Sequence, residues 1–326
     1  MNEIQIGQVL DDRFKILSVV TRSGMASIYE AIDCNTGEAV AIKVPFMQFE
    51  SDPAFYSRFL REEEIGKVLN HPSILHVISV DREKSRPYIA MEFLRGRTLA
   101  HMLRCVRPLP MEDALRIASS ICDALIYMHR PDVNVIHRDI KPDNIMLCND
   151  GTLRIMDFGI ARADLRSVTL GGFPASFLGT PDYMAPEQIK GHRVDARTDL
   201  YSLGALLFEM TTGTVPFKGD NIYTIMNARL VGDPPAPRTI NPDIPPKVEE
   251  IILHALERNP NDRYQSAAEM KAALDCPNAV KLTGRNTRLN APKMWRIWLR
   301  ILRPYIVGIS LPVLTFLAFY LHNRKR

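Results

Sequence analysis

The chain has 326 residues, 46% of them hydrophobic and 24% charged, a composition typical of globular proteins and a length that suits two compact lobes. Its five cysteines are odd in number and include no Cys-x-x-Cys pair, which argues against a disulfide framework or a zinc site. The N-terminus has no basic segment followed by an apolar run, so it does not predict a signal peptide.

The formal net charge of +4 is unevenly distributed along the chain. Residues 1–275 carry 31 basic and 37 acidic side chains, whereas the remainder has ten Lys or Arg and no Asp or Glu. A strongly basic segment suits an anionic partner, either lipid or nucleic acid. The apolar run within the same segment favours lipid, and no nucleic-acid partner is predicted.

Two kinds of periodicity divide the chain. Segments rich in β-branched and aromatic residues predict strands over 14–20, 28–32, 39–44 and 87–93. Apolar side chains at helical spacing predict helices over 52–69, 111–128, 195–212, 221–230 and 247–256. The chain therefore changes near residue 95 from a small sheet with one helix to a larger helical unit.

The C-terminal segment predicts a membrane anchor. Residues 305–321 are 17 residues without a charge, at the lower limit of about 17–25 for a spanning helix, and two apolar residues lengthen the run if Arg303 snorkels. Aromatic side chains flank the run, as at membrane interfaces. We expect a basic juxtamembrane linker over 276–300, a transmembrane helix over 301–321 and a short basic tail over 322–326.

Two alternatives for this run are a buried helix of the body and a helix that lies on the membrane surface. Pro312 in mid-run and the lack of a polar face disfavour both. Seven basic residues precede the run and three follow it, so the larger count places the N-terminal body in the cytoplasm. We expect a single-pass protein of the cell (inner) membrane, anchored at its C-terminus and without an extracytoplasmic sensor domain.

Three motifs give the strongest functional signal. Residues 135–147 read VIHRDIKPDNIML, residues 157–159 read DFG and residues 185–187 read APE. In this order they match H-R-D-x-x-x-x-N, D-F-G and A-P-E, and the chain resembles eukaryotic-like (Hanks-type) serine/threonine protein kinases over about residues 14–275. With its C-terminal apolar run, it is similar to the bacterial membrane-anchored Ser/Thr kinases.

This resemblance implies an α+β fold with two lobes and ATP between them. The small antiparallel β-sheet lobe is expected over about residues 14–94 and the larger helical lobe over about 95–275. The implied activity is transfer of the ATP γ-phosphate to protein Ser/Thr hydroxyls, with autophosphorylation. Protein substrates and the lipid bilayer are the expected partners, and a homodimer through the kinase domain is left open.

Phosphoryl transfer depends mainly on positioning and charge neutralisation. Asp139 is the expected carboxylate that orients the substrate hydroxyl and accepts its proton, and Lys141 places positive charge on the transferring phosphoryl group. Asp157 and Asn144 are the expected ligands of Mg²⁺, with Mn²⁺ as an alternative ion. The resemblance adds Thr180, which in the family bonds to the catalytic aspartate and lysine and helps to select Ser/Thr substrates.

The segment Ala39-Val40-Ala41-Ile42-Lys43 matches the V-A-I-K strand of the family, so Lys43 is expected to contact the α- and β-phosphates. Among three consecutive glutamates, Glu62 matches the family partner of this lysine by its spacing to a later His-Pro pair. Glu62 also shares a helix face with apolar residues, so it is expected to face inward. Its neighbours Glu63 and Glu64 are expected to be solvated.

The resemblance also locates an adenine site. Met91-Glu92-Phe93-Leu94 aligns with the family hinge, and Glu92 and Leu94 are the expected contacts to adenine. The side chains expected to sandwich the purine are Ile28, Ala41 and Met146. Packing in the hydrophobic core would also account for these apolar residues. The adenine-binding and core-packing interpretations agree, because a bound adenine would complete an apolar core.

The stretch VVTRSGMASIY stands where the family has its G-x-G-x-x-G-x-V loop over the phosphates. The three glycine positions fall on Thr21, Ser23 and Ala26, Gly24 lies between them, and Ile28 takes the valine position. Each replacement restricts φ and brings a Cβ atom toward the phosphates. Backbone N–H groups of this loop remain expected phosphate contacts.

Three hypotheses follow from the missing glycines. ATP binds under a stiffer lid, or nucleotide binds with little turnover, or the protein is a pseudokinase that acts as a nucleotide-binding membrane scaffold. The intact Lys43, Glu62, Asp139, Asn144 and Asp157 favour the first, because a pseudokinase has no chemical need for all five.

Other matches point to regulation and architecture. Arg138 precedes the catalytic aspartate, and in family members with this arginine a phosphorylated activation loop often docks on it. Ser167, Thr169 and Ser176 are the candidate phosphorylation sites, with Thr169 favoured. The resemblance assigns packing or bracing roles to His137, Asp199 and the pair Glu187 and Arg263.

Overall fold

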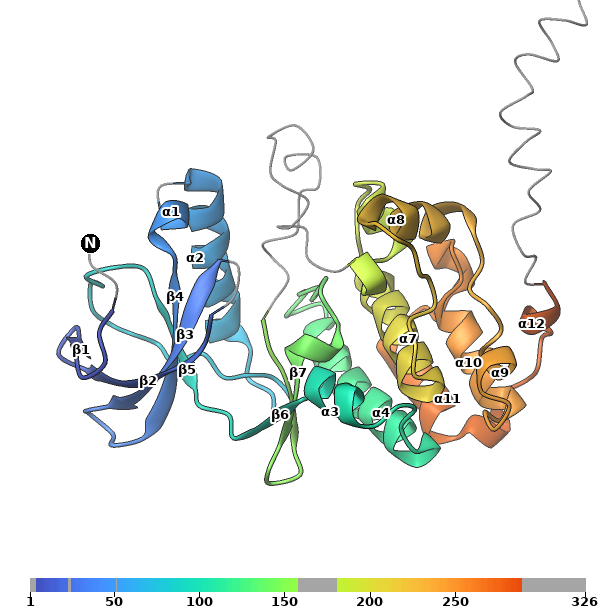
Figure 1. The fold of residues 1–326 in the computed structure, drawn as a ribbon, viewed down its shortest axis with the longest axis horizontal. Coiled ribbons are helices and arrows are strands. Elements are labelled where there is room, and N and C mark those ends of the chain that lie inside the picture. The colour runs from blue at the N-terminus through green and yellow to red at the C-terminus, as the bar shows by residue number, and fades with distance from the viewer. Residues whose placement is uncertain (1–3, 23–24, 51, 158–180, 289–326) are drawn as a thin grey trace, which may run out of the picture.

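A five-stranded antiparallel sheet forms the N-terminal lobe of the computed structural model, which describes residues 4–22, 25–50, 52–157 and 181–288 (Figure 1). Its strands follow one another in space in sequence order. They are β1 (Val9–Leu10), β2 (Phe14–Arg22), β3 (Ala26–Asp33), β4 (Ala39–Pro45) and β5 (Ile89–Glu92). Each strand is thus joined to its neighbour by a direct connection, except that helices and a loop separate β4 from β5.

The two faces of this sheet have different neighbours. Val40, Ile42 and Val44 of β4 are buried with apolar residues of β2 and β3 on one face. Lys43, which alternates with them, lies on the other face, because successive strand residues point to opposite sides. Helix α2 (Pro53–Val68) covers that face, and the short α1 (Met47–Glu50) precedes it. Lys43 is therefore held between the sheet and α2.

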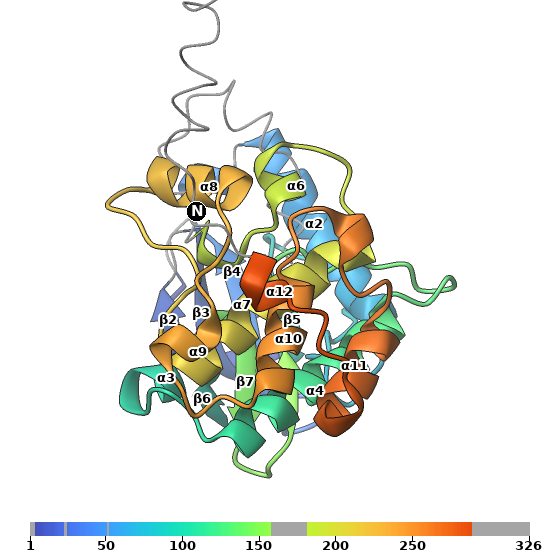
Figure 2. The same cartoon turned by 90° about the vertical axis from the view of Figure 1, so that its right-hand side faces the viewer.

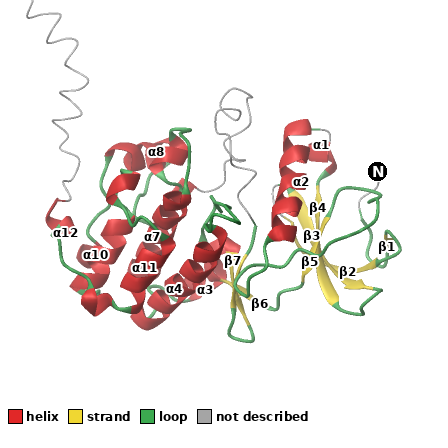
Figure 3. Ribbon diagram, turned by 180° about the vertical axis from the view of Figure 1, so that it is seen from behind, coloured by secondary structure: helices red, strands yellow, loops and turns green. Residues whose placement is uncertain are grey.

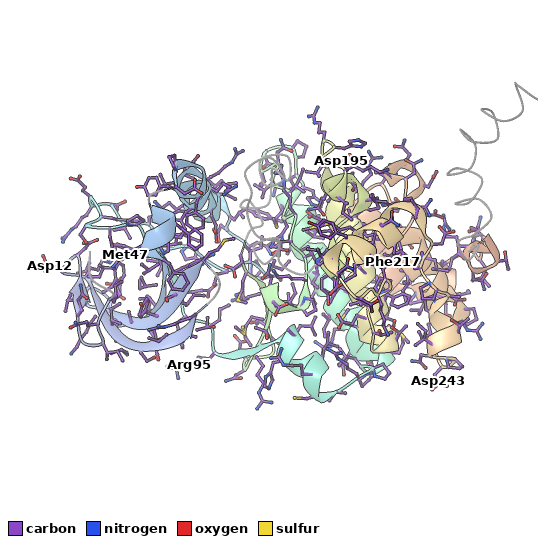
Figure 4. The ribbon with its side chains drawn as sticks, turned by 45° about the horizontal axis from the view of Figure 1, so that its top comes forward. Asp12, Met47, Arg95, Asp195, Phe217 and Asp243 are labelled. Atoms are coloured by element: carbon purple, nitrogen blue, oxygen red, sulfur yellow. The ribbon has the colours of Figure 1, made fainter. Side chains whose placement is uncertain are left out.

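A second, three-stranded sheet lies between the first sheet and the helices (Figure 3). It consists of β6 (Gly96–Thr98), β7 (Ile145–Cys148) and β8 (Leu153–Ile155), all antiparallel. Arg95, which directly precedes β6, lies at the connection between the two lobes (Figure 4). The chain crosses from one lobe to the other at this point.

The helical lobe is built around α7 (Ala196–Thr212), in which every residue from Thr198 to Thr212 is buried. Asp195 starts this helix as an N-cap by accepting a hydrogen bond from the backbone N–H of Arg197. The other helices are α3 (Leu99–Cys105), α4 (Met111–Met128), α6 (Pro186–Ile189), α8 (Ile222–Val231), α9 (Pro237–Ile240), α10 (Pro246–Ala255), α11 (Ala267–Asp275) and α12 (Arg285–Arg288). Short 3₁₀ turns lie at Pro142–Asn144, Pro181–Tyr183, Pro260–Asp262 and Pro277–Ala279.

The predicted two-lobed α+β architecture is confirmed, and the long elements lie where periodicity places them. The helix predicted over 111–128 has the bounds of α4, and the helix predicted over 52–69 is α2 with one residue fewer at each end. The strand predicted over 14–20 continues to Arg22, and the short helix α1 was not predicted. No helix in the described ranges is both long and apolar enough to cross a bilayer, and the predicted span 301–321 lies outside them.

The beginning of the expected linker packs on the helical lobe. In α12, Arg285 places Nη1 2.6 Å from Glu250 Oε1 and Nε 3.0 Å from Glu257 Oε1. Glu250 is buried on α10, so α12 lies beside that helix (Figure 2). Within the segment expected to be a linker, Arg285 is thus held on the helical lobe by two ion pairs.

Close packing of α7 on α10 depends on Gly204. A Cβ atom at this position meets Cβ of Ala255 at 2.6 Å, well inside contact distance. We expect Gly204→Ala to lower the free energy of unfolding by about 1–3 kcal/mol, measured by urea denaturation, because the helices must move apart. The paired change Gly204→Ala with Ala255→Gly should restore part of the loss, and no recovery would contradict this account.

Candidate active site

Lys43 holds two carboxylates from distant parts of the chain. Its Nζ lies 2.6 Å from Oε1 of Glu62 on α2 and 2.8 Å from Oδ1 of Asp157, which follows β8. The exposed fractions of the three side chains are 16% for Lys43, 15% for Glu62 and 41% for Asp157. The structure thus joins β4, α2 and the segment after β8 at one point, and Asp157 is the member open to solvent.

The electrostatics of this cluster follow from its burial and charges. Burial opposes the charge on Lys43, but Asp157 and Glu62 together outweigh it and raise the pKa of the lysine. Lys43 is also the main cause that lowers the pKa of Asp157. Burial raises the pKa of Glu62, against the effect of Lys43. The cation is therefore firmly charged, and Asp157 is kept ionised.

The segment between α4 and β7 brings three more predicted residues together. Lys141 Nζ lies 2.9 Å from Oδ2 of Asp139. The amide Nδ2 of Asn144, a buried residue, donates to the same Oδ2 at 2.9 Å and to the backbone oxygen of Asp139 at 2.8 Å. A 3₁₀ turn over Pro142–Asn144 folds the chain back, so that the Asn144 side chain can reach Asp139. The Asp139 carboxylate is thereby fixed by one ammonium and one amide.

A backbone hydrogen bond links this loop to the Lys43 cluster. The N–H of Met156 donates to the backbone oxygen of Asn144 at 2.8 Å, and Asp157 follows with φ of +49°. A non-glycine residue with positive φ is uncommon and costs conformational energy. The surrounding contacts therefore hold Asp157 in a conformation that turns its carboxylate toward Lys43.

The buried Asp199 of α7 fixes the backbone just before Asp139. It accepts the N–H groups of His137 at 2.9 Å and Arg138 at 2.8 Å, and His129 Nε2 lies 2.8 Å from its Oδ2. Burial alone would raise the pKa of Asp199, but His129 and the loop outweigh burial and lower it. Arg138 has φ of +68°, so Asp199 holds a strained turn in place.

His137 and Arg138 stand directly before Asp139 in the chain. His137 is fully buried, with Nε2 3.1 Å from the backbone oxygen of Met156, which fits a packing role. The half-buried Arg138 receives a hydrogen bond at its backbone oxygen from Nε2 of Gln188. Sequence reasoning missed Gln188, although its place directly after Ala-Pro-Glu is a usable signal.

The Ala-Pro-Glu segment is fastened by a buried ion pair. Both guanidinium Nη atoms of Arg263 lie 2.8 Å from the two carboxylate oxygens of Glu187, and Thr198 donates to the same carboxylate. Burial opposes the ionised carboxylate, yet Arg263 lowers the pKa of Glu187. This bidentate pair ties the segment at 185–187 to the C-terminal part of the lobe.

The predicted adenine contacts lie around an apolar cluster below β3 and β4. Ala41 and Met91 are buried in it, and Ile28 and Leu94 pack against it. The backbone N–H of Glu92 donates to the backbone oxygen of His76. The backbone N–H of His76 in turn donates to the Glu92 carboxylate at 2.9 Å. Met146 lies half-buried on β7, opposite Thr98 and Arg154.

The loop that replaces the glycine motif is described only at its two ends. Thr21 pairs with Ile28 across the hairpin, and Ala26 is buried at the start of β3. Ser23 and Gly24 lie outside the described residues, as do Thr180 and the candidate phosphorylation sites Ser167, Thr169 and Ser176. The hairpin therefore stays paired up to the edge of the predicted phosphate-binding segment.

Glu63 and Glu64 differ although both were expected to be solvated. Glu64 is exposed, as expected, whereas Glu63 is only 6% exposed and the expectation for it is wrong. The reason is that Lys67 and Lys84 both reach its Oε1 at 2.6 Å. Lys84 is a further residue near the site that sequence reasoning did not identify.

Asp157 and Asn144 offer oxygen atoms of the kind that a hard divalent cation prefers. Asp157 offers an accessible carboxylate, and Asn144 is tied to Asp139 through its amide nitrogen, which leaves its oxygen for another partner. Among the described residues no cluster of three or more His, Cys, Asp or Glu could hold a metal ion alone. One carboxylate and one amide suit Mg²⁺, which commonly completes its coordination with phosphate oxygens and water.

The fold and the site define a two-lobed phosphotransferase, with a lysine–glutamate pair in the sheet lobe and a carboxylate loop in the helical lobe. The family model described as "Protein kinase domain" matches residues 14–274. The chain therefore belongs to the protein kinase family, whose members use ATP and a divalent metal. Its curated relatives include several bacterial serine/threonine-protein kinases, which supports its assignment as a Hanks-type serine/threonine kinase.

Three relatives illustrate the similarity. A probable serine/threonine-protein kinase of Streptomyces coelicolor is 41% identical over 82% of this chain and 40% of its own. Serine/threonine-protein kinase PknB of Mycolicibacterium smegmatis is 36% identical over 87% of this chain and 47% of its own. Serine/threonine-protein kinase PrkC of Bacillus subtilis is 37% identical over 82% of this chain and 41% of its own. The chain thus spans less than half the length of these curated relatives.

Solved structures agree on the fold. The crystal structure of the Mycobacterium tuberculosis PknI kinase domain matches with a TM-score of 0.67 and 26% identity, over 84% of this chain and all of that one. A structure of Rad53 in complex with AMP-PNP matches with a TM-score of 0.64 and 26% identity, over 79% of this chain and 64% of that one.

The Lys43 cluster predicts a pH-dependent stability difference. A carboxyl group whose pKa is raised in the folded state holds its proton more tightly there, so stability falls as pH rises through that pKa. Burial already raises the pKa of Glu62, and Lys43→Met removes the opposing cation. We expect the stability deficit of Lys43→Met relative to the parent to grow between about pH 5 and pH 8.

Urea unfolding at a series of pH values measures this deficit. The lowered pKa of Asp157 adds to the deficit at lower pH, because the parent gains stability from that ionised carboxylate as pH rises toward the ordinary aspartate pKa of about 4. The double variant Lys43→Met with Glu62→Gln should show a smaller slope. A deficit that stays constant with pH would show that the cluster does not couple these groups.

Proposed function

We propose that this protein is a serine/threonine kinase that transfers the ATP γ-phosphate to protein hydroxyls. The observation that supports it best is Lys43 in contact with both Glu62 and Asp157, together with an Asp139 carboxylate held by Lys141 and Asn144. The names of the bacterial relatives agree with this activity. The AMP-PNP in the Rad53 structure agrees with an adenine nucleotide as the donor.

Each residue of the site has a distinct part in the proposed reaction. Asp139 orients the substrate hydroxyl and accepts its proton as the hydroxyl oxygen bonds to the γ-phosphorus and the bond to the bridging oxygen of ADP breaks. Lys141, next to Asp139, offsets charge on the transferring group. Lys43 binds the remaining phosphates of the nucleotide. Asp157 and Asn144 would hold Mg²⁺, or Mn²⁺ in its place, and the bound ion would supply further positive charge near the phosphate oxygens.

The remaining roles are also proposals. The backbone of residues 21–26 covers the phosphates. Adenine is sandwiched by the side chains of Ile28, Ala41 and Met146, beside Glu92 and Leu94. The protein phosphorylates itself in the segment that contains Ser167, Thr169 and Ser176, and the new phosphate docks on Arg138. Thr180 helps to select Ser/Thr substrates, and a homodimer through the kinase domain would let one copy modify another.

We expect purified protein with ATP and Mg²⁺ to transfer labelled phosphate to itself and to a generic basic protein. Asp157→Asn should abolish transfer, and Asp139→Asn should lower kcat by about 10²–10⁴-fold, since the proton acceptor is lost. Mapping the labelled peptides tests the three candidate phosphorylation sites. No transfer by folded protein whose Tm rises with ATP would support the alternative, a pseudokinase scaffold.

Membrane attachment through residues 301–321 is part of the same proposal and depends on the sequence pattern alone. An uncharged apolar run with aromatic flanks and basic neighbours suits a spanning helix. Because most basic residues precede the run, the kinase body would lie on the cytoplasmic side of the inner membrane. The packing of Arg285 on α10 then keeps the body close to the start of the span.

We expect the full chain to remain in the membrane fraction after an alkaline carbonate wash. Leu314→Arg with Leu317→Arg should release it, because each central arginine costs about 2.5–3.5 kcal/mol on insertion. Asn290→Arg, outside the run, is the matched control and should leave the distribution unchanged. Equal retention of all three proteins would rule out a spanning helix at this position.

A further inference from the structure

We propose that Lys84 and Glu63 position helix α2 for catalysis by fastening it to the sheet beside the Lys43–Glu62 pair. This inference rests on the proposed kinase function. Lys84 lies in the loop before β5, and Glu63 is the direct neighbour of Glu62 on α2. We call the contact between Lys84 and Glu63 the tether.

The tether joins α2 to the segment before β5 through one half-buried ammonium group. Nζ of Lys84 lies 2.6 Å from Oε1 of Glu63 and donates to the backbone oxygen of Tyr88 at 2.7 Å. The same Nζ lies 4.7 Å from the centre of the Tyr88 ring. Tyr88 is fully buried and packs edge-on against Phe14 of β2. Lys84 therefore connects α2 to residues that are fixed in the core of the sheet lobe.

The position of the tether on α2 gives it an effect that apolar packing lacks. Consecutive side chains on a helix point about 100° apart, so Glu62 and Glu63 leave α2 in clearly different directions. Glu62 meets Lys43 on β4, and Glu63 meets Lys84 before β5. A helix held at one point can roll about its axis, whereas two contacts in different directions fix its rotation.

The other contacts of α2 do not set its rotation as closely. Phe55 and Phe59 pack with Val77 and Ile89, and such hydrophobic contacts are non-directional. Gly66 lets the helix approach so closely that a Cβ atom there would lie 2.3 Å from Cγ2 of Val77. This packing sets the distance of α2 from the sheet and leaves the fine orientation of Glu62 to the polar contacts.

Lys67 offers a natural comparison with Lys84. Its Nζ also lies 2.6 Å from Oε1 of Glu63, but Lys67 belongs to α2 itself, one turn farther on, and is 32% exposed. Lys67 can offset the buried charge of Glu63 without connecting the helix to anything else. Loss of Lys84 alone therefore removes the connection and leaves Glu63 with a cationic partner. Such a variant should fold.

The first measurement compares steady-state kinetics of the full-length protein with those of Lys84→Met, Lys84→Arg and Lys67→Met. We expect Lys84→Met to lower kcat about five- to tenfold with little change in KM for the protein substrate, since misplacing a catalytic group by 1 Å can cost about 10²-fold. Lys84→Arg should retain most of the activity, and Lys67→Met should resemble the parent. Equal losses in Lys84→Met and Lys67→Met would overturn the proposal, because charge and not connection would then be decisive.

The second measurement asks whether Lys84 acts through Glu62. If it does, Lys84→Met should have little further effect on kcat in a Glu62→Gln background, whereas independent effects would multiply. If the double variant lost activity by the product of the two single-variant factors, the proposal would be overturned. Failure of both Lys84→Met and Glu63→Gln to fold would do so as well, because the pair would then serve folding and not positioning.

The third measurement does not depend on activity, so it separates failure of this inference from failure of the proposed function. Hydrogen–deuterium exchange of the nucleotide-free protein should be faster over 53–68 in Lys84→Met than in the parent, and unchanged over 196–212. An inactive parent with this exchange difference would refute the kinase function and support the tether. Unchanged exchange over 53–68 would refute the tether whatever the activity.

Discussion

The contact of Lys43 with Glu62 and Asp157 is the interaction on which the site depends, because its members lie far apart in the sequence. Two partly buried carboxylates so close together would repel each other and favour protonation of one of them. The ammonium between them makes the arrangement favourable and requires β4, α2 and the segment after β8 to meet in one register. The positive φ of Asp157 is a local cost of that requirement.

The helical lobe meets a comparable requirement in a different way. There the organising carboxylate, Asp199, lies within α7, whose residues are buried over nearly its whole length. It accepts hydrogen bonds from backbone N–H groups of the loop before Asp139, so the position of the loop is fixed relative to a helix that is buried over nearly its whole length. Glu62, by contrast, lies on α2, a helix at the surface of a small sheet lobe. The position of Glu62 and Lys43 is thus expected to be adjustable, whereas the position of the loop that contains Asp139 is expected to be fixed.

Sequence patterns predicted those parts of the fold and site that repeat at a regular spacing or form a contiguous motif. Helix 111–128 is long and periodic, and the loop that contains Asp139 and Asn144 forms one motif, so both lie where expected. Glu63 was placed in solvent because helical periodicity assigns a face but does not reveal a partner 21 residues away in a loop. The contact of Arg285 with Glu250 was missed for the same reason, since a polar segment resembles a linker until its partner is known.

The glycine-poor hairpin makes the fixation of Lys43 more important. Strand pairing continues to Arg22 opposite Ser27, so little of the segment is left as a free loop between β2 and β3. Ala26, at a glycine position of the motif, is buried, so its methyl group is accommodated in the packed lobe. Residues with a Cβ atom have less backbone freedom to follow the phosphates than glycine has. In the proposed reaction, a loop with less backbone freedom would leave more of the phosphate positioning to Lys43, whose own position depends on its contact with α2.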